Sequence, residues 1–245
     1  MIGCELEIKT LDGVAKAYVT RPAGTTALRG AVMFIDALGY RPTMHAIADR
    51  VAATGYVVVV PNIFYREGDY APFDPKTVFA GGAELQRLMK LVTGYDDRAA
   101  MRDAATWLDF LDRRDDVRER AHGAFGYCMG GGLALQTACA YPDRVAAVAS
   151  FHGGRFLTTA DGAQQLATRC KAATYVGVAQ IDRNHDQAVT DRLEAAFTTA
   201  GVPHAIERYP DASHGWCVPD HPAYQAEGAE RHYGKLGELF AKHLR

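Results

Sequence analysis

Short apolar runs alternate with segments of helical periodicity along most of the chain. Strand-sized apolar runs lie at residues 31–35, 57–60, 123–127, 145–150, 173–178 and 204–209. Patterns typical of helices lie at residues 42–54, 83–92, 97–113, 130–140, 186–200 and 222–243. This alternation predicts an α/β class protein with a mostly parallel sheet and helices on both faces. Sites in such sheets form at the carboxyl ends of the strands.

Residues 62–82 interrupt this alternation with an irregular stretch rich in aromatic residues, glycine and proline. A loop of this length inside a compact domain is usually functional. We find no internal repeat and no linker, and 245 residues suit one domain of this class. We therefore expect a single domain over residues 1–245.

Composition narrows the possible partners. Hydrophobic residues make up 48% of the chain, charged residues 23%, and the net charge is −2 with basic residues spread throughout. These values predict a soluble protein whose partner is neither nucleic acid nor a membrane. We see no signal peptide and no apolar run long enough to span a bilayer.

The cysteines are widely spaced and form no CxxC pair. They are Cys4, Cys128, Cys139, Cys170 and Cys217. Such spacing argues against a disulfide framework or a zinc site and favours a reducing, cytoplasmic location. No HExxH motif or clustered ligand set is present, so we expect neither a metal nor another cofactor.

The most informative motif is the glycine-rich segment around Cys128, Gly126-Tyr127-Cys128-Met129-Gly130. It lies between a predicted strand and a predicted helix, as the nucleophile elbow of α/β-hydrolases does, with cysteine in place of serine. The helix N-terminus beneath the sulfur would favour a thiolate. The alternative is a glycine-rich turn around a structural cysteine. A phosphate-binding loop is disfavoured because the characteristic lysine and glycine spacing are missing.

An acid and a base follow later strands in the order that an α/β-hydrolase requires. Asp182 follows the strand at 173–178, and His214 follows the strand at 204–209 in a Ser-His-Gly turn. With Cys128 they would form a nucleophile–base–acid triad. Asp186 competes with Asp182, and the histidines that compete with His214 are His152, His185 and His221.

The ordered set of motifs resembles the dienelactone hydrolase family over nearly the whole chain. It includes Gly-Tyr-Cys-Met-Gly-Gly at 126–131, Ser-Phe-His-Gly-Gly at 150–154, the Asp182 loop, the Ser-His-Gly turn at 213–215, and Val-Pro-Asn-Ile-Phe-Tyr-Arg at 60–66. The resemblance implies an α/β-hydrolase fold without a large cap domain. It also implies that Asp36, at the position of a glutamate in well-known members, controls the resting thiol.

Backbone amides of Met129 and Ala37 would form the oxyanion hole. The resemblance further implies arginines that hold a substrate carboxylate. One of these positions is Val218 here, and for the other only Arg66 and Arg87 are candidates. A less acidic or more apolar substrate is therefore favoured.

Eight residues next to predicted strand ends or the elbow are candidates to line a largely apolar pocket. They are Tyr40, Phe64, Tyr65, Arg66, Tyr127, Phe151, His152 and Trp216. The alternative interpretation is that each of these side chains belongs to the core, and His152 could also be a structural histidine.

Together these features predict a hydrolase that opens a lactone or cleaves an ester through Cys128, His214 and Asp182 and a thioester acyl-enzyme. A general carboxylesterase or thioesterase on the same triad is the main alternative. A non-hydrolytic protein that binds a ligand or senses oxidants through Cys128 is another. We expect a small ester or lactone as the partner, and a monomer or small homo-oligomer.

Overall fold

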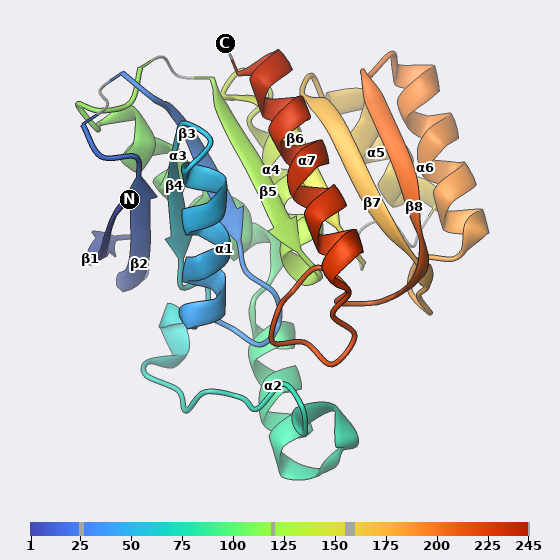
Figure 1. Cartoon of the computed structure of the whole chain (residues 1–245), viewed down its shortest axis with the longest axis horizontal. Coiled ribbons are helices and arrows are strands. Elements are labelled where there is room, and N and C mark those ends of the chain that lie inside the picture. Colours follow the sequence, from blue (N-terminus) through green and yellow to red (C-terminus); the bar gives the residue numbers. More distant parts are fainter. Residues whose placement is uncertain (25–26, 119–120, 155–159, 245) are drawn as a thin grey trace.

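The computed structural model describes residues 1–24, 27–118, 121–154 and 160–244. Within these residues the centre is one eight-stranded sheet in the order β1-β2-β4-β3-β5-β6-β7-β8 (Figure 1). Its strands are β1 (Ile2–Lys9), β2 (Val14–Arg21), β3 (Arg29–Phe34), β4 (Tyr56–Pro61), β5 (His122–Tyr127), β6 (Val145–Phe151), β7 (Ala173–Ile181) and β8 (His204–Ser213). The β1–β2 and β2–β4 pairs are antiparallel and the remaining pairs are parallel. The predicted mostly parallel sheet is confirmed.

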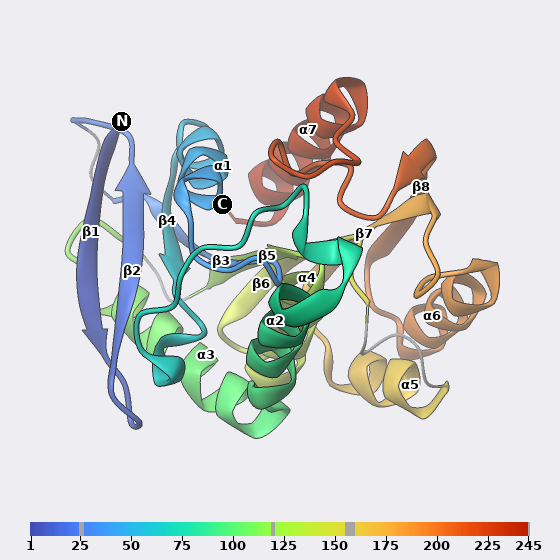
Figure 2. The ribbon, with the colours of Figure 1, turned by 90° about the horizontal axis from the view of Figure 1, so that it is seen from below.

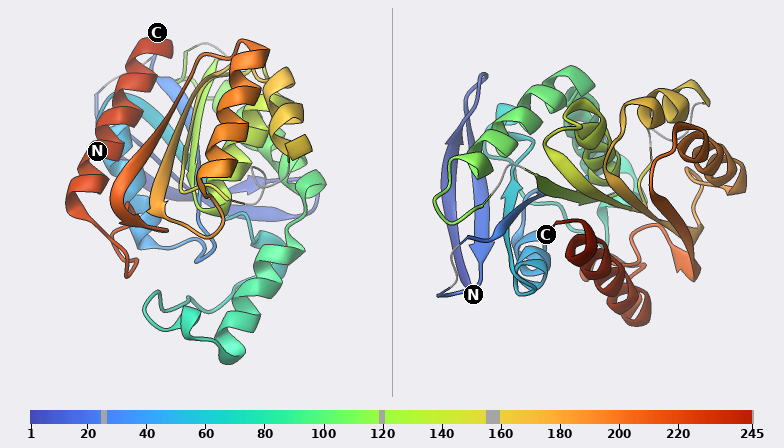
Figure 3. Two further views of the ribbon diagram at one scale, coloured as in Figure 1. Left: turned by 90° about the vertical axis from the view of Figure 1, so that its right-hand side faces the viewer. Right: turned by 90° about the horizontal axis from the view of Figure 1, so that it is seen from above.

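Helices cover both faces of the sheet. On one face lie α1 (Pro42–Ala52) and α7 (Ala226–His243); on the other lie α3 (Asp97–Asp112), α4 (Met129–Ala140), α5 (Ala160–Arg169) and α6 (Gln187–Ala200) (Figures 2 and 3). Every residue of β3, β4 and β5 is buried, as expected of parallel strands covered on both sides. None of the described helices combines the length and apolar character that a bilayer span requires.

A smaller group of elements extends beyond the carboxyl ends of the parallel strands. It comprises the 3₁₀ turns η1 (Tyr65–Glu67) and η2 (Val78–Ala80) and helix α2 (Gly82–Gly94), which projects from the body of the molecule (Figure 1). The irregular stretch predicted at 62–82 corresponds to the two turns and their connections. This segment therefore lies at the end of the sheet where a site is expected.

Several element boundaries differ from the sequence-based expectation. The N-terminal hairpin of β1 and β2 was not predicted, although β2 alternates exposed and buried positions with the period of a strand. Helix α5 was also missed. Helix α7 begins at Ala226 rather than at 222, because the Gln225 amide turns back to donate to the Trp216 carbonyl at 2.8 Å.

Two strand registers bring distant parts of the chain together. Tyr127 of β5 pairs with Phe151 of β6, and Ile181 of β7 pairs with Ser213 of β8. Both β7 and β8 run further than predicted, so their ends coincide. The residues that follow each pair therefore emerge side by side at one edge of the sheet.

Candidate active site

Cys128 occupies a strained turn between β5 and α4. Its backbone has φ 56° and ψ −123° at the N-cap of α4, a conformation that is uncommon for a residue with a side chain. Such strain costs on the order of 1–3 kcal/mol and persists only where the surroundings enforce it. The observed geometry is that of a strand-to-helix elbow.

The flanking glycines are required by close backbone packing at this elbow. A Cβ at Gly126 would lie 2.2 Å from the carbonyl oxygen of Gly130, and one at Gly130 would lie 2.4 Å from the carbonyl oxygens of Phe34 and Ile35. Neither contact can be relieved by rotating a side chain, because the obstructing atoms are backbone. The glycine spacing in the sequence thus reflects the tight approach of α4 to β3.

His214 and Asp182 form a close pair at the ends of β8 and β7. His214 Nδ1 donates to Asp182 Oδ2 at 2.7 Å, and the Asp182 side chain is almost completely buried. The other carboxylate oxygen accepts the Asn184 amide at 2.9 Å. This arrangement orients the imidazole so that its Nε2 is the atom available to other groups.

The electrostatics of this pair favour a charged imidazole. Burial lowers the pKa of His214, but the hydrogen bond to Asp182 and the contact with Cys128 outweigh it and raise the pKa to about 10. Burial raises the pKa of Asp182, but its hydrogen bond with His214 prevails and the pKa lies below the usual value. The positive charge on the His214 imidazole therefore stabilises a negative group placed beside it.

Two of the four competitors for these positions, Asp186 and His185, make other contacts. Asp186 caps α6 by accepting the Val189 amide at 2.9 Å. His185 is buried, with its Nδ1 3.3 Å from the Gly153 carbonyl oxygen. The side chains of both are engaged away from Cys128, so the geometry supports the pairing of His214 with Asp182.

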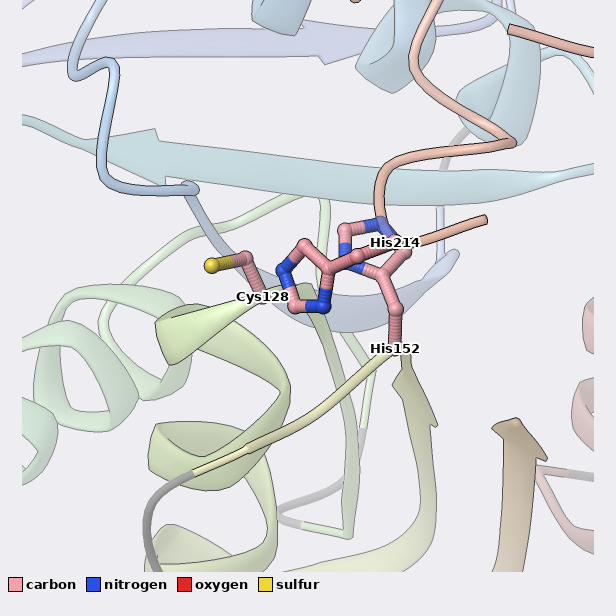
Figure 4. Close-up of side chains that lie close together, drawn as sticks. All are labelled: Cys128, His152 and His214. Carbon is pink, nitrogen blue, oxygen red and sulfur yellow. The ribbon is translucent and has the colours of Figure 1, made fainter. Parts of the chain in front are cut away.

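His152 completes a cluster with Cys128 and His214. One donor atom from each of the three side chains lies within 4.8 Å of the others, and Figure 4 shows the His214 imidazole directed toward Cys128 with His152 beside it. The two imidazole rings meet edge to face at 4.7 Å. His152 is buried and has φ 40°, and within the described part of the chain neither ring nitrogen has a hydrogen-bond partner. Burial and the neighbouring His214 hold the pKa of His152 well below its usual range.

Asp36 lies at the end of β3 but is engaged by Arg41. Arg41 Nη1 and Nη2 donate to the two carboxylate oxygens of Asp36 at 2.6 and 2.9 Å, and the Leu38 amide donates to Oδ1 at 3.0 Å. The same guanidinium donates to Asp220, in the loop after His214, at 2.7 and 2.9 Å. Arg41 thus connects the loop after β3 to the loop after β8.

A small pocket of about 80 Å³ opens over the cluster. It is lined by Asp36, Ala37, Leu38, Phe79, Cys128, His152, His214, Gly215 and His221. The Met129 amide, the first of α4, directly follows Cys128, and Ala37 lies in the pocket wall. Among these lining residues there is no lysine or arginine.

Of the eight residues predicted to line the pocket, His152 alone does so in the described part of the chain. Four of the others are buried core: Phe64, Tyr127, Phe151 and Trp216. Tyr127, for example, is completely buried and lies 3.0 Å from His232 Nε2 through its hydroxyl. Aromatic residues at these strand ends fill the space beneath the site because both faces of the sheet are covered.

The remaining three side chains form hydrogen bonds with residues outside the pocket. Tyr65 and Arg66 both bind Asp103, at 3.0 Å and 2.8 Å, and Tyr40 donates to Glu5 at 3.0 Å. Arg87, the other candidate for a carboxylate, donates to Glu84 and to the Ala71 carbonyl. Val218 is fully buried. The arginine candidates therefore do not reach the pocket.

Four lining residues were not among the predicted site residues: Leu38, Phe79, Gly215 and His221. Phe79 comes from η2, and its ring lies 5.8 Å from that of His221. The aromatic character of residues 62–82 was the available signal for Phe79. The sequence around His221 indicates a possible base but carries no pattern typical of a pocket wall.

Comparison with known proteins identifies the family to which this fold belongs. The model of the dienelactone hydrolase family matches residues 15–244. A carboxymethylenebutenolidase of Rhodococcus opacus is 29% identical over 223 residues, which cover 87% of this chain and 81% of that protein.

Solved structures show the same fold. A dienelactone hydrolase-like promiscuous phosphotriesterase from metagenomic libraries superposes with a TM-score of 0.80 at 21% identity, covering 99% of each chain. A dienelactone hydrolase from Anabaena variabilis superposes with a TM-score of 0.71 at 18% identity, covering 100% of this chain and 99% of that one. The predicted α/β-hydrolase fold is confirmed, and the chain belongs to the dienelactone hydrolase family of hydrolases.

Proposed function

We propose that the protein hydrolyses an ester or lactone through a Cys128–His214–Asp182 triad and a thioester acyl-enzyme. The observation that carries this proposal is the 2.7 Å hydrogen bond between His214 Nδ1 and Asp182 Oδ2 beside the Cys128 elbow. It assigns Nδ1 to the acid and leaves Nε2 for the nucleophile. Orientation of the base by a buried carboxylate is what the triad mechanism needs.

The reaction follows from these positions. His214 accepts the thiol proton, and the Cys128 thiolate attacks the carbonyl carbon. The amides of Met129 and Ala37 stabilise the oxyanion, and His214 then protonates the departing alcohol or enolate. Water activated by His214 hydrolyses the thioester and releases the acid. Loss of one oxyanion donor in such a site raises the barrier by about 2.7–4 kcal/mol.

In this proposal Asp36 fixes the loop that carries Ala37. The resemblance led us to expect a carboxylate that contacts the resting thiol. Both Asp36 oxygens, however, are held by Arg41, and one of them also accepts the Leu38 amide. A carboxylate bound in this way positions the oxyanion loop without having to move toward Cys128.

The pocket favours a small, uncharged acyl group. Its described lining contains no lysine or arginine, and its volume is about 80 Å³. A carboxylate placed there would lose hydration and meet no lysine or arginine of the described lining, and the charged imidazole of His214 is already paired with Asp182. This observation supports the second candidate function, a general carboxylesterase or thioesterase on the same triad.

The test compares hydrolysis of a cis-dienelactone, p-nitrophenyl acetate and an acyl thioester. Wild type is measured beside Cys128→Ala and the matched control Cys4→Ser, whose thiol is exposed on β1. We expect Cys128-dependent cleavage of the neutral ester and a lower kcat/KM for the anionic lactone. Full activity in Cys128→Ala would overturn the triad proposal, and faster cleavage of the anionic lactone would overturn the substrate preference.

A further inference from the structure

Cys128, His152 and His214 present a soft, three-donor set at the base of the pocket. We propose that these side chains bind a thiophilic divalent cation, with Zn²⁺ the best match, in a site that blocks the hydrolytic centre reversibly. Their donor atoms lie within 4.8 Å of one another. Tetrahedral zinc with Zn–N bonds of about 2.0–2.1 Å and a Zn–S bond of about 2.3 Å separates its ligands by roughly 3.3–3.6 Å. Closing the cluster by about 1 Å would therefore complete the coordination.

His152 supplies the independent reason to expect a ligand. It is 2% exposed, yet neither ring nitrogen has a hydrogen-bond partner among the residues that the structure describes. Buried polar groups are almost always satisfied, so an unpartnered imidazole in a pocket wall indicates a missing partner. A metal ion bound to one nitrogen would satisfy that atom.

Asp182 adds the outer shell that zinc-binding histidines usually have. Its carboxylate accepts from His214 Nδ1 at 2.7 Å, which directs Nε2 toward the cation. Such carboxylate–histidine–metal arrangements orient the ring and increase its basicity. The two positive charges of Zn²⁺ are balanced by the Cys128 thiolate and the neighbouring Asp182 carboxylate.

The fourth coordination position faces the pocket. The pocket volume of about 80 Å³ leaves room for a water molecule, which occupies about 30 Å³ in the liquid. On binding, the protons held by the Cys128 thiol and by His214 Nε2 pass to solvent, one Zn–S bond and two Zn–N bonds form, and hydration water leaves the ion. No electrons are transferred.

Inhibition rests on the proposed function, whereas binding does not. The cation would occupy the sulfur that acts as nucleophile and the imidazole nitrogen that acts as base. Bound metal and hydrolysis are therefore mutually exclusive, and a chelator should restore activity. Metal binding can be measured without substrate, so failure of one proposal is distinguishable from failure of the other.

The direct test is calorimetric titration of Zn²⁺ into chelator-treated protein, together with absorption spectra of the Co²⁺-loaded protein. We expect one site per chain and a thiolate-to-cobalt charge-transfer band. Cys128→Ala should remove the band, and His152→Phe, which keeps a ring of similar size, should weaken Zn²⁺ binding at least tenfold. Asp182→Asn should weaken it about 10–100-fold, as loss of an outer-shell partner does.

Cys4→Ser serves as the control for metal bound at an exposed thiol, and circular dichroism melts verify that each variant is folded. Wild-type affinity in folded Cys128→Ala or His152→Phe would overturn the proposed site. A lower number of Zn²⁺ ions bound per chain in Cys4→Ser would also overturn the proposed site. So would the absence of Zn²⁺ binding by wild type. Loss of the charge-transfer band in Cys128→Ala together with weakened binding in His152→Phe would support it.

Discussion

Ile181 of β7 pairs with Ser213 of β8, and this register places Asp182 beside His214. Parallel neighbours advance together along the strands, so the residues that follow a pair leave the sheet side by side. The Tyr127–Phe151 pair does the same for Cys128 and His152. Two backbone registers thus bring together four side chains from four strand ends.

The Asp182–His214 pair should make stability depend on pH. The His214 pKa is raised from 6.5 to about 10, so this contribution is complete below pH 6.5 and is lost as pH rises toward 10. The Asp182 pKa is lowered from 3.8, so its contribution is present above that pH and is lost in more acidic solution. The difference in melting temperature between wild type and Asp182→Asn should therefore be largest between about pH 4 and pH 6.5, and shrink above it.

The same variant should lower the pKa of His214, which titration of the ring by NMR would measure. Asp186→Asn is the matched control, because asparagine also caps helices and the Asp186 carboxylate accepts from the Val189 amide at the start of α6. An unchanged pKa in Asp182→Asn would contradict the assignment of Asp182.

Arg41→Ala should impair both stability and catalysis. The guanidinium is buried between Asp36 and Asp220, and removing one partner of a buried ion pair typically costs about 3–5 kcal/mol. Denaturant unfolding would measure this loss. Because the loops that carry Ala37 and His214 would lose their common anchor, kcat should fall more than KM changes.

Thr43→Val is the control for this cluster, since the Thr43 hydroxyl donates to the outer carboxylate, Asp220, at 2.6 Å. Thr43→Val should lower the free energy of unfolding by less than Arg41→Ala does, and it should leave kcat nearly unchanged. Equal kcat values for wild type and folded Arg41→Ala would rule out an anchoring role.

Gly130→Ala should prevent formation of the elbow. Its Cβ would approach two backbone carbonyl oxygens at 2.4 Å, so α4 would have to move away from β3. We expect loss of activity and a melting temperature lowered by many degrees.

Gly234→Ala on α7 is the opposite case, because a Cβ there meets nothing within 4 Å. Replacing that helical glycine should stabilise the protein by about 0.8–1 kcal/mol, and a destabilised Gly234→Ala would contradict the described helix.

Tyr127→Phe should reduce stability with little effect on catalysis per folded molecule. The Tyr127 hydroxyl is buried and lies 3.0 Å from His232 Nε2, so its removal leaves that nitrogen unpartnered. Such a loss costs about 1–3 kcal/mol. Denaturant unfolding and kcat/KM, each corrected for the folded fraction, would separate the two effects. A large change in KM would instead indicate that the Tyr127 side chain contacts the substrate.

Sequence alone was sufficient for the features that depend on local chemistry. Four consecutive valines predict a buried parallel strand, and glycines two residues from Cys128 predict a tight strand-to-helix turn. The order of Cys128, Asp182 and His214 after successive strands follows from the same patterns. These predictions work because secondary structure and sharp turns are governed by neighbouring residues.

Tertiary structure decided which side chains reach the pocket. Tyr127 and Trp216 sit beside candidate site residues in the sequence but point into the core, whereas Phe79 and His221 come from separate loops and line the pocket together. Arg41 could not be identified either, because its two carboxylate partners are distant from each other in the chain. Strand register, loop path and the direction of each side chain determine such contacts, and these depend on packing between elements rather than on local sequence.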